Sequence, residues 1–159
     1  MISFHGPVWR ILSTGPDLDA RAAVRAPEGR FHHSGQTALY ASLSAEGAGV
    51  ALRRYVKAGD APRIIVKLTI CAERIFDLRG TDAAKAASVV WQDIRGSGAP
   101  APTWTFSDRA RAAGAQGMLY ASRSRPDLSH LVLFDLSPGI VQNVGPAEPW
   151  LPPYPVPKG

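Results

Sequence analysis

The sequence predicts a single α+β domain built around a mixed or antiparallel sheet, and three observations lead to this fold class. The chain has 159 residues, of which 45% are hydrophobic, which is enough for one compact core but not for two independent ones. Short segments of β-branched and aromatic residues alternate along the chain with alanine-rich segments of helical spacing. Glycine and proline separate these segments and predict turns between them.

Strands are predicted where apolar residues alternate with polar or small ones and a turn follows. Residues 63–70 show this pattern best, because every second residue from Ile64 to Ile70 is aliphatic and would lie on one face. The expected strands are residues 7–12, 37–42, 63–70, 74–78, 117–121, 130–136 and 140–144.

Helices are predicted from helical spacing and from residues that commonly cap a helix. Ser44 is expected to cap a helix that runs to about Lys57, and Ser107 is expected to cap another over residues 107–113. Two further helices are expected over residues 17–24, which begin with an acidic residue, and over residues 82–94, which are rich in alanine.

The end of the chain is a separate, proline-rich segment. Half of the fourteen prolines lie in it or just before it, and proline is incompatible with a helix interior or a central strand. We therefore expect a domain over residues 1–145 and an extended arm over residues 146–159 that packs Trp150 and Tyr154 on the domain. A docking ligand for a proline-recognising partner is the less favoured alternative.

The charge of the chain favours anionic partners. Eighteen Lys and Arg against thirteen Asp and Glu give a net charge of +5. The excess is mostly arginine, whose planar guanidinium suits phosphates and carboxylates. The arginines are dispersed, and there is no zinc-finger spacing, RNA-binding aromatic signature or long basic helix. We therefore expect no direct binding of nucleic acid.

Several other classes of protein are disfavoured. No apolar run is long enough for a membrane span, and residues 1–10 lack the features of a secretory signal, so we expect a cytoplasmic protein. The single Cys71 excludes an internal disulfide, and its neighbours Ile70 and Ala72 predict a small, buried side chain. No carboxylate accompanies the four histidines, so no metal site is expected.

Three short segments place polar side chains at the expected ends of strands. Arg30 stands beside Gly29 in a turn, where its guanidinium could contact a diphosphate through two hydrogen bonds. Tyr40 could stack on an aromatic ring, and Ser42 and Ser122 could hydrogen-bond an amide or a hydroxyl. Taken singly, each of these residues is better explained by an ordinary structural role.

Taken together and in this order, the segments carry more information. They are Val8-Trp9-Arg10-Ile11, Gly29-Arg30-Phe31 with Gly35, Leu39-Tyr40-Ala41-Ser42, Gly114 through Ser122, and Leu131-Val132-Leu133-Phe134. In sequence and spacing they resemble the RES-domain toxins of bacterial toxin–antitoxin systems, and in particular the ParT-like members. The resemblance runs from Val8 to about Phe134, which is most of the chain.

The resemblance implies an ADP-ribosyltransferase-like fold and NAD+ as the substrate. It implies the toxin of a type II system, which cleaves the nicotinamide–ribose bond and transfers ADP-ribose to a protein acceptor. Destruction of NAD+ by a glycohydrolase or phosphorylase reaction is the alternative outcome of the same cleavage. A cognate antitoxin is the implied partner.

The resemblance also implies roles for particular residues. Arg30 would clamp the diphosphate or ribose, and Tyr40 would form an aromatic wall for nicotinamide. Arg10 is a second candidate for the phosphates, Phe31 in the same loop as Arg30 is a further residue expected to bind the dinucleotide, and Ser122 would orient the carboxamide or ribose.

The resemblance breaks at the catalytic acid. The essential Glu of the family lies on the helix after the tyrosine strand, and Ala51 stands at the matching position. Glu46 lies more than a turn earlier and faces another direction on a 3.6-residue repeat, so we do not expect it to substitute. Ala51 reflects a natural loss or an inactivating Glu-to-Ala change, and the otherwise intact site favours the second. The chain as written is expected to be inactive.

Two other functions fit parts of the sequence. Gly47 and Gly49 suggest a dinucleotide-binding fingerprint, but Leu52 replaces its third glycine and no acidic residue ends a suitable second strand. A non-catalytic module, which has lost its acid and persists through its antitoxin interface, is the alternative of a different class. The residue that the native gene encodes at position 51 distinguishes this module from an enzyme.

Overall fold

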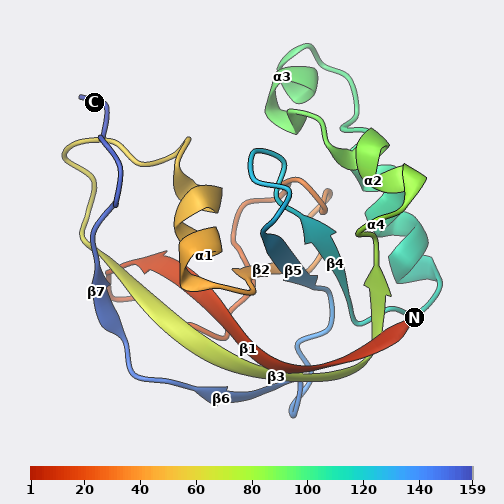
Figure 1. Cartoon of the computed structure of the whole chain (residues 1–159), viewed down its shortest axis with the longest axis horizontal. Coiled ribbons are helices and arrows are strands. Elements are labelled where there is room, and N and C mark those ends of the chain that lie inside the picture. Colours follow the sequence, from red (N-terminus) through yellow and green to blue (C-terminus); the bar gives the residue numbers. More distant parts are fainter. Residues whose placement is uncertain (159) are drawn as a thin grey trace.

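A computed structural model describes residues 1–158, which form a seven-stranded sheet with helices beside it (Figure 1). The strands are β1 (Ile2–Ser13), β2 (Leu39–Ser42), β3 (Arg63–Asp77), β4 (Gly117–Ala121), β5 (Ser129–Leu133), β6 (Val141–Val144) and β7 (Glu148–Trp150). The helices are α1 (Ala45–Leu52), α2 (Asp82–Ala87), α3 (Trp91–Gly96) and α4 (Thr103–Ala112). The predicted α+β class with a mixed sheet is confirmed, because β3 and β4 are parallel and the other pairs are antiparallel.

Five of the strands close into a ring through their pairings. β1 pairs with β2, β2 with β5, β5 with β4, β4 with β3, and β3 again with β1. The long strands β1 and β3 run side by side across the lower part of Figure 1. β6 and β7 continue the sheet along the other edge of β3. The ring therefore has an inner and an outer face, and successive residues of each strand alternate between them.

The two faces bury different side chains. The inner face is filled by aliphatic residues: Val8, Leu39, Ala41, Val66, Leu68, Ile70, Ala72, Ile75, Leu119, Leu131 and Leu133. A second cluster covers the outer face of β2, β5 and β4 with residues of the loop before β2 and of α2 and α4: Phe31, Ala38, Leu78, Ala87, Ala110, Ala115, Met118, Tyr120 and Val132. Tyr40 and Ser42 lie on this outer face, because Tyr40 is opposite Val132 and Ser42 is opposite His130.

Helix α1 begins where the sequence predicts and packs closely on the sheet. The hydroxyl of Ser44 caps it by accepting a hydrogen bond from the Gly47 amide (2.9 Å). A Cβ atom on Gly47 would lie 2.2 Å from Ser42 Oγ, so only glycine permits this approach. The helix ends at Leu52 rather than near Lys57, because its last turn tightens to a three-residue repeat.

The proline-rich arm lies against the domain, beside β3 and then beside α1 (Figure 1, blue). β7 pairs with the first residues of β3 as an edge strand, where proline is tolerated. The Tyr154 hydroxyl donates to the Gly49 carbonyl (2.9 Å), and the Trp150 ring would lie 3.4 Å from a Cβ atom on Gly49. Trp150 and Tyr154 thus pack on the domain as the sequence predicts, whereas a domain boundary at residue 145 stays a prediction.

The helix predicted over residues 17–24 is absent from the structure, which has turns there. The carbonyls of Ala20 and Ala22 accept hydrogen bonds from Arg10 Nη1 (2.9 and 2.7 Å). These carbonyls are therefore satisfied by a side chain of β1 instead of by backbone amides of a helix.

Two other helices differ from their predicted bounds. Residues 82–94 form parts of two short helices, because the Ala87 carbonyl, which would accept from residue 91 in a continuous helix, accepts from Arg30 (3.0 Å). Helix α4 begins about one turn before Ser107, which is buried within it and does not cap it. No helix within residues 1–158 combines the length and apolar character needed to cross a membrane.

The predicted strands are confirmed, although β1 begins five residues before its predicted start and β5 ends three residues before its predicted end. One prediction about a side chain is wrong. Residues 63–70 and 74–78 belong to one continuous strand, β3, which β1 accompanies along its length. Cys71 is partly exposed on the outer face of β3 and is not buried. Ile70 and Ala72 take the inward positions on either side, so alternation directs Cys71 outward.

We expect Gly47→Ala to destabilise the protein. The added methyl group would overlap Ser42 Oγ, which is held by hydrogen bonds to Ser129 and His130. The free energy of unfolding, measured by urea denaturation, should fall by roughly 1–3 kcal/mol, as overpacking usually costs. Gly96→Ala is the control, because its added Cβ would meet no atom within 4 Å. An equal change in both variants would contradict the close packing of α1.

Candidate functional site

Three consecutive carbonyl groups, in the loop at residues 29–31, are held by helix α4. Trp104 Nε1 donates to the first (2.8 Å), the Thr103 hydroxyl to the second, and Arg111 Nη1 to the third (2.8 Å). Arg111 also donates to the Thr37 carbonyl (3.0 Å) further along the loop. Because these bonds fix the peptide planes, they also fix the directions in which the side chains of residues 29–31 leave the loop.

Arg30 brings a positive charge into the protein without a counter-ion. Its Nη2 donates to the Ala87 carbonyl (3.0 Å), but its Nε is buried and has no hydrogen-bond partner in the described part of the chain. Among residues 1–158, no carboxylate forms an ion pair with it. Burial lowers the pKa of Arg30 below its usual value. A buried cation with a free N–H group is suited to bind an anion.

Tyr120 lies next to this guanidinium. Its ring meets the ring of Phe31 edge-on, with 4.6 Å between the centres, and the Arg30 guanidinium carbon lies 5.0 Å from the centre of each ring. Burial raises the pKa of Tyr120 to about 12, so its hydroxyl keeps its proton. The electron-rich ring faces stabilise the guanidinium in part, where a carboxylate would otherwise do so.

The hydroxyl of Tyr40 is fixed by two neighbours. It accepts from the Phe31 amide (2.9 Å) and lies 2.7 Å from His32 Nδ1. His32 Nε2 donates to the Ala26 carbonyl (2.8 Å), so Nδ1 of the neutral ring accepts the Tyr40 proton. Burial lowers the pKa of His32 and raises that of Tyr40, so both are uncharged at neutral pH. The ring of the half-buried Tyr40, rather than its hydroxyl, is left to contact a ligand.

His130 is held in one tautomer on the same face. The Ser42 hydroxyl donates to the Ser129 carbonyl (3.2 Å) and therefore accepts from His130 Nδ1 (2.9 Å). Burial and the nearby charge of Arg30 lower the pKa of His130 to about 4, so the ring is neutral and Nε2 is its unprotonated nitrogen. The ring centre lies 5.4 Å from that of Tyr120, which places a hydrogen-bond acceptor beside the cation.

Ser122 lies at the turn that follows β4. It is buried, and its hydroxyl accepts from the Arg125 amide (3.3 Å). The Arg125 side chain pairs with Glu46 of α1 (3.0 Å) and with Asp127 (2.8 Å). Glu46 is thus engaged by a cation of this turn, and this ion pair joins the start of α1 to the segment that carries Ser122.

Ala51 is exposed on α1, one helical turn after Gly47. Residues four apart share a helix face, and the Gly47 face is the one that contacts Ser42. A long side chain at position 51 would lean towards the start of the helix and therefore towards Ser42 and His130. Position 51 is thus open to solvent on the helix face that carries Gly47.

Arg10 does not join these residues. Trp9 is opposite Ser42 on the outer face, so the next residue, Arg10, points inward. Its guanidinium donates to the carbonyls of Ala20 and Ala22, and burial lowers its pKa to about 10. The expected role in phosphate binding is not supported by this placement, because Arg10 holds the loop after β1 instead.

Phe31 contributes without touching a ligand through its ring. The residue is fully buried, with 0% of its surface exposed. Its amide fixes the Tyr40 hydroxyl and its ring supports the Arg30 guanidinium. Its predicted direct contact with the dinucleotide is therefore replaced by a positioning role.

We refer to the residues that the outer face brings together as the Arg30 cluster: Arg30, Tyr40, Ser42, Tyr120 and His130. The sequence predicts Arg30 and Tyr40 as ligand-binding residues but assigns no ligand-binding role to Tyr120 or His130. The sequence does carry a signal for both residues. Each lies near an end of a predicted strand and close to a serine, which is where the polar side chains of such a cluster are expected.

Comparisons with known proteins agree with this architecture. A family model described as "RES domain" matches residues 7–154, whereas no curated protein matches the chain. Among solved structures, a chain of the MbcT–MbcA toxin–antitoxin complex of M. tuberculosis shares the fold with a TM-score of 0.67. That alignment has 20% identity and covers 95% of this chain and 87% of the other. The ADP-ribosyltransferase-like fold is thereby confirmed, and the chain belongs to the RES domain family.

Proposed function

We propose that this chain is the toxin of a type II toxin–antitoxin system and that its substrate is NAD+. Membership of the RES domain family supports this proposal, as does the fold shared with a chain of the MbcT–MbcA toxin–antitoxin complex. The protein acts in the cytoplasm, where an antitoxin is its partner. It cleaves the bond between nicotinamide and ribose and transfers ADP-ribose to a protein acceptor.

The observation that carries the proposal is the half-buried side chain of Arg30, whose buried Nε–H group has no hydrogen-bond partner within residues 1–158 and which forms no ion pair there. A diphosphate supplies the missing negative charge and accepts hydrogen bonds from a guanidinium in a planar, paired geometry. The half-buried ring of Tyr40 lies on the same face and offers nicotinamide an aromatic surface. A diphosphate joined to an aromatic base and a ribose therefore fits the chemistry of the Arg30 cluster.

The reaction breaks the bond between C1′ of the ribose and nicotinamide, and its electron pair leaves with nicotinamide. The ribose passes through an oxocarbenium-like state, which a nucleophile of the acceptor captures while losing a proton. His130 Nε2 is unprotonated and can accept a hydrogen bond from a ribose hydroxyl. A carboxylate near the ribose would stabilise the positive charge, and Ala51 stands where the family has it.

Ala51 favours a second candidate function, in which the chain is a non-catalytic module that binds an antitoxin. Calorimetry with NAD+ distinguishes the two, because an inactivated enzyme with an intact Arg30 cluster still binds the dinucleotide. A module in which the Arg30 cluster has also lost its function does not bind NAD+.

Transfer, hydrolysis and phosphorolysis share the cleavage step and differ in the nucleophile. Incubation of the Ala51→Glu protein with NAD+ labelled in the adenylate part separates them. Label in protein after addition of a bacterial lysate indicates transfer, free ADP-ribose indicates hydrolysis, and phosphorylated ADP-ribose in phosphate buffer indicates phosphorolysis. We expect labelled protein.

We expect Ala51→Glu to raise the rate of nicotinamide release by roughly a thousandfold or more, because the new carboxylate stabilises the charge that develops on the ribose. Nicotinamide release from NAD+, followed by chromatography, measures this rate. Ala51→Gln is the matched control, since it has the same shape without the charge, and it should stay as slow as the chain itself. Equal rates in the glutamate and glutamine variants would refute the assignment of position 51.

We expect Arg30→Lys, combined with Ala51→Glu, to reduce kcat/KM for NAD+ at least about 100-fold, or about 2.7 kcal/mol. Lysine is a point charge and cannot reproduce the planar, paired contact of the guanidinium. Arg21→Lys is the control, because Arg21 is exposed, and it should keep full activity. Circular dichroism checks that each variant is folded, and near-full turnover of Arg30→Lys would reduce Arg30 to a structural charge.

We expect the cognate antitoxin and NAD+ to compete for the Arg30 cluster. A site that attracts a diphosphate also attracts an acidic side chain or a terminal carboxylate of a polypeptide. In calorimetry, saturating antitoxin should eliminate the binding of NAD+. In a separate kinetic measurement, high salt should slow the association of the antitoxin. Undiminished affinity for NAD+ in the complex would mean that the antitoxin acts from a distant surface.

A further inference from the structure

We propose that the protein binds a zinc ion at a second site, formed by His5, Cys71 and Glu73 on the outer face of β1 and β3. The site shares no residue with the Arg30 cluster, so the proposal stands independently of the proposed function.

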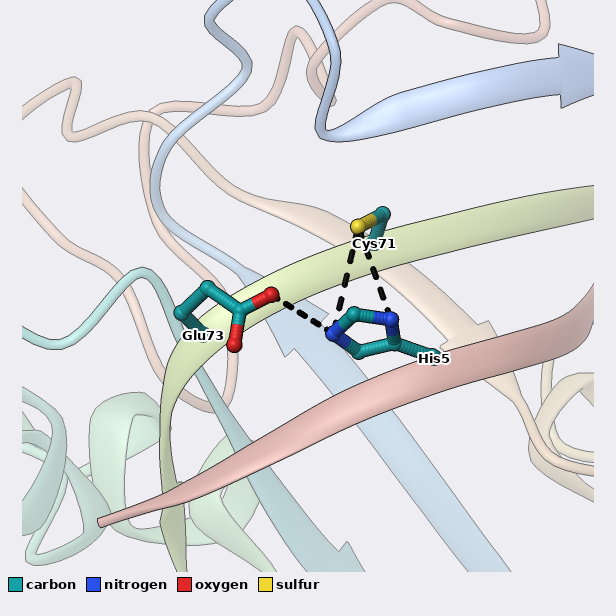
Figure 2. A group of neighbouring side chains, drawn as sticks. All are labelled: His5, Cys71 and Glu73. Atoms are coloured by element: carbon teal, nitrogen blue, oxygen red, sulfur yellow. Dashed lines mark hydrogen bonds and ion pairs between the residues drawn. The ribbon is translucent and has the colours of Figure 1, made fainter.

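The register of the two strands brings these three side chains together. His5 of β1 is directly opposite Cys71 of β3, so both side chains leave the sheet on the same face. Glu73 follows two residues later on β3 and lies on that face as well. One ligand atom from each residue lies within 4.8 Å of the others, and Figure 2 shows the three side chains directed toward one another. A paired strand framework holds the three backbones at fixed spacing before any ion arrives.

A rotation of the exposed His5 ring would bring these atoms to the distances found around a zinc ion, because Cys71 Sγ now lies about equally far from Nδ1 and Nε2 of that ring (3.7 and 3.9 Å). His5 Nε2 lies 2.7 Å from Glu73 Oε1 and 3.9 Å from Cys71 Sγ. Bond lengths of about 2.0 Å to nitrogen and oxygen and about 2.3 Å to sulfur place tetrahedral ligand atoms about 3.3–3.5 Å apart. The two separations from His5 Nε2 therefore need to change by roughly half an ångström, and Cys71 Sγ and the Glu73 carboxylate already lie within 4.8 Å of each other.

The kind of ligand atom selects the kind of ion. A thiolate, an imidazole and a carboxylate are the ligands that zinc prefers, whereas magnesium and calcium are bound through oxygen. Three protein ligands leave the fourth position to water. The side chains of His5 and Glu73 are 54% and 66% exposed, so an ion reaches them directly from solvent.

The surroundings of Glu73 support an ordered ligand. The Ser3 hydroxyl donates to Glu73 Oε2 (2.9 Å), while Oε1 faces His5. A hydrogen bond from a neighbouring group commonly orients a carboxylate that binds a metal through its other oxygen. Glu73 is thus held with one oxygen directed at the centre of the site.

The sequence predicts no metal at this site, because His5 lies far from Cys71 and Glu73 along the chain and no pair of histidines or cysteines near them has ligand spacing. His5 and Glu73 are separated by 68 residues and meet only through the pairing of β1 with β3. The antiparallel pairing of β1 with β3 thus brings to His5 the carboxylate of Glu73, which the sequence alone does not indicate.

Titration of the untagged full chain with Co2+, as a spectroscopic substitute for Zn2+, tests the site. We expect a near-ultraviolet charge-transfer band from a thiolate bound to cobalt, saturation at one ion per chain, and loss of the band when Zn2+ is added. Cys71→Ser should abolish the band. His5→Gln and Glu73→Gln should each weaken binding at least about tenfold, since even neighbours of metal ligands commonly contribute this much.

His33→Gln is the matched control for these variants. His33 and Asp108 form another histidine–carboxylate pair (2.8 Å) but have no thiol beside them, so this variant should bind cobalt like the unaltered chain. Absence of the charge-transfer band in the unaltered chain, or its persistence in Cys71→Ser, would overturn the proposal. Equal weakening in His33→Gln would also overturn it, because binding would then not depend on this site. Circular dichroism checks the fold of each variant.

Discussion

The bonds between helix α4 and the loop at residues 29–31 are the interactions on which the rest of the site depends. Three consecutive carbonyl groups accept hydrogen bonds from Trp104, Thr103 and Arg111, and these bonds stabilise the observed conformation of the loop. That conformation places Arg30 over two aromatic rings and beside buried, uncharged groups. An unpaired cation in such surroundings is unfavourable by itself. The hydrogen bonds along the loop therefore keep the Arg30 guanidinium in a position where it can bind an anion.

The closed ring of strands divides the polar residues between two environments. Residues of β1 alternate, so Trp9 faces outward while Arg10 faces inward and supports a loop. On the outer face, Tyr40 and Ser42 from β2 meet Tyr120 and His130 from β4 and β5, because register places them side by side. Burial raises the pKa of Tyr40 and Tyr120 and lowers that of His130, so all three side chains are uncharged at neutral pH. The Arg30 cluster is thus a set of neutral acceptors and rings around one cation.

The sequence predicts the fold class and most strands, because alternation and turn residues are local signals. Failures occur where a distant side chain decides the outcome. Arg10 takes the carbonyls that a helix over residues 17–24 would need, and Cys71 faces outward because its neighbours fill the interior. Arg30 and Tyr40 are identified from short motifs. His130 is not, since its importance arises only when β5 lies beside β2 and β4.

The carbonyl of Ala87 gives Arg30 a role in the helices as well as in the ligand site. This carbonyl accepts from the guanidinium where α2 ends, and α3 begins four residues later. A ligand that binds the Arg30 guanidinium competes with the Ala87 carbonyl for the N–H groups of Arg30. Once the Ala87 carbonyl has lost this hydrogen bond, it can accept one from a backbone amide and so extend α2. Ligand occupancy and helical content over α2 and α3 are then linked through one shared acceptor, and each must affect the other to the same degree.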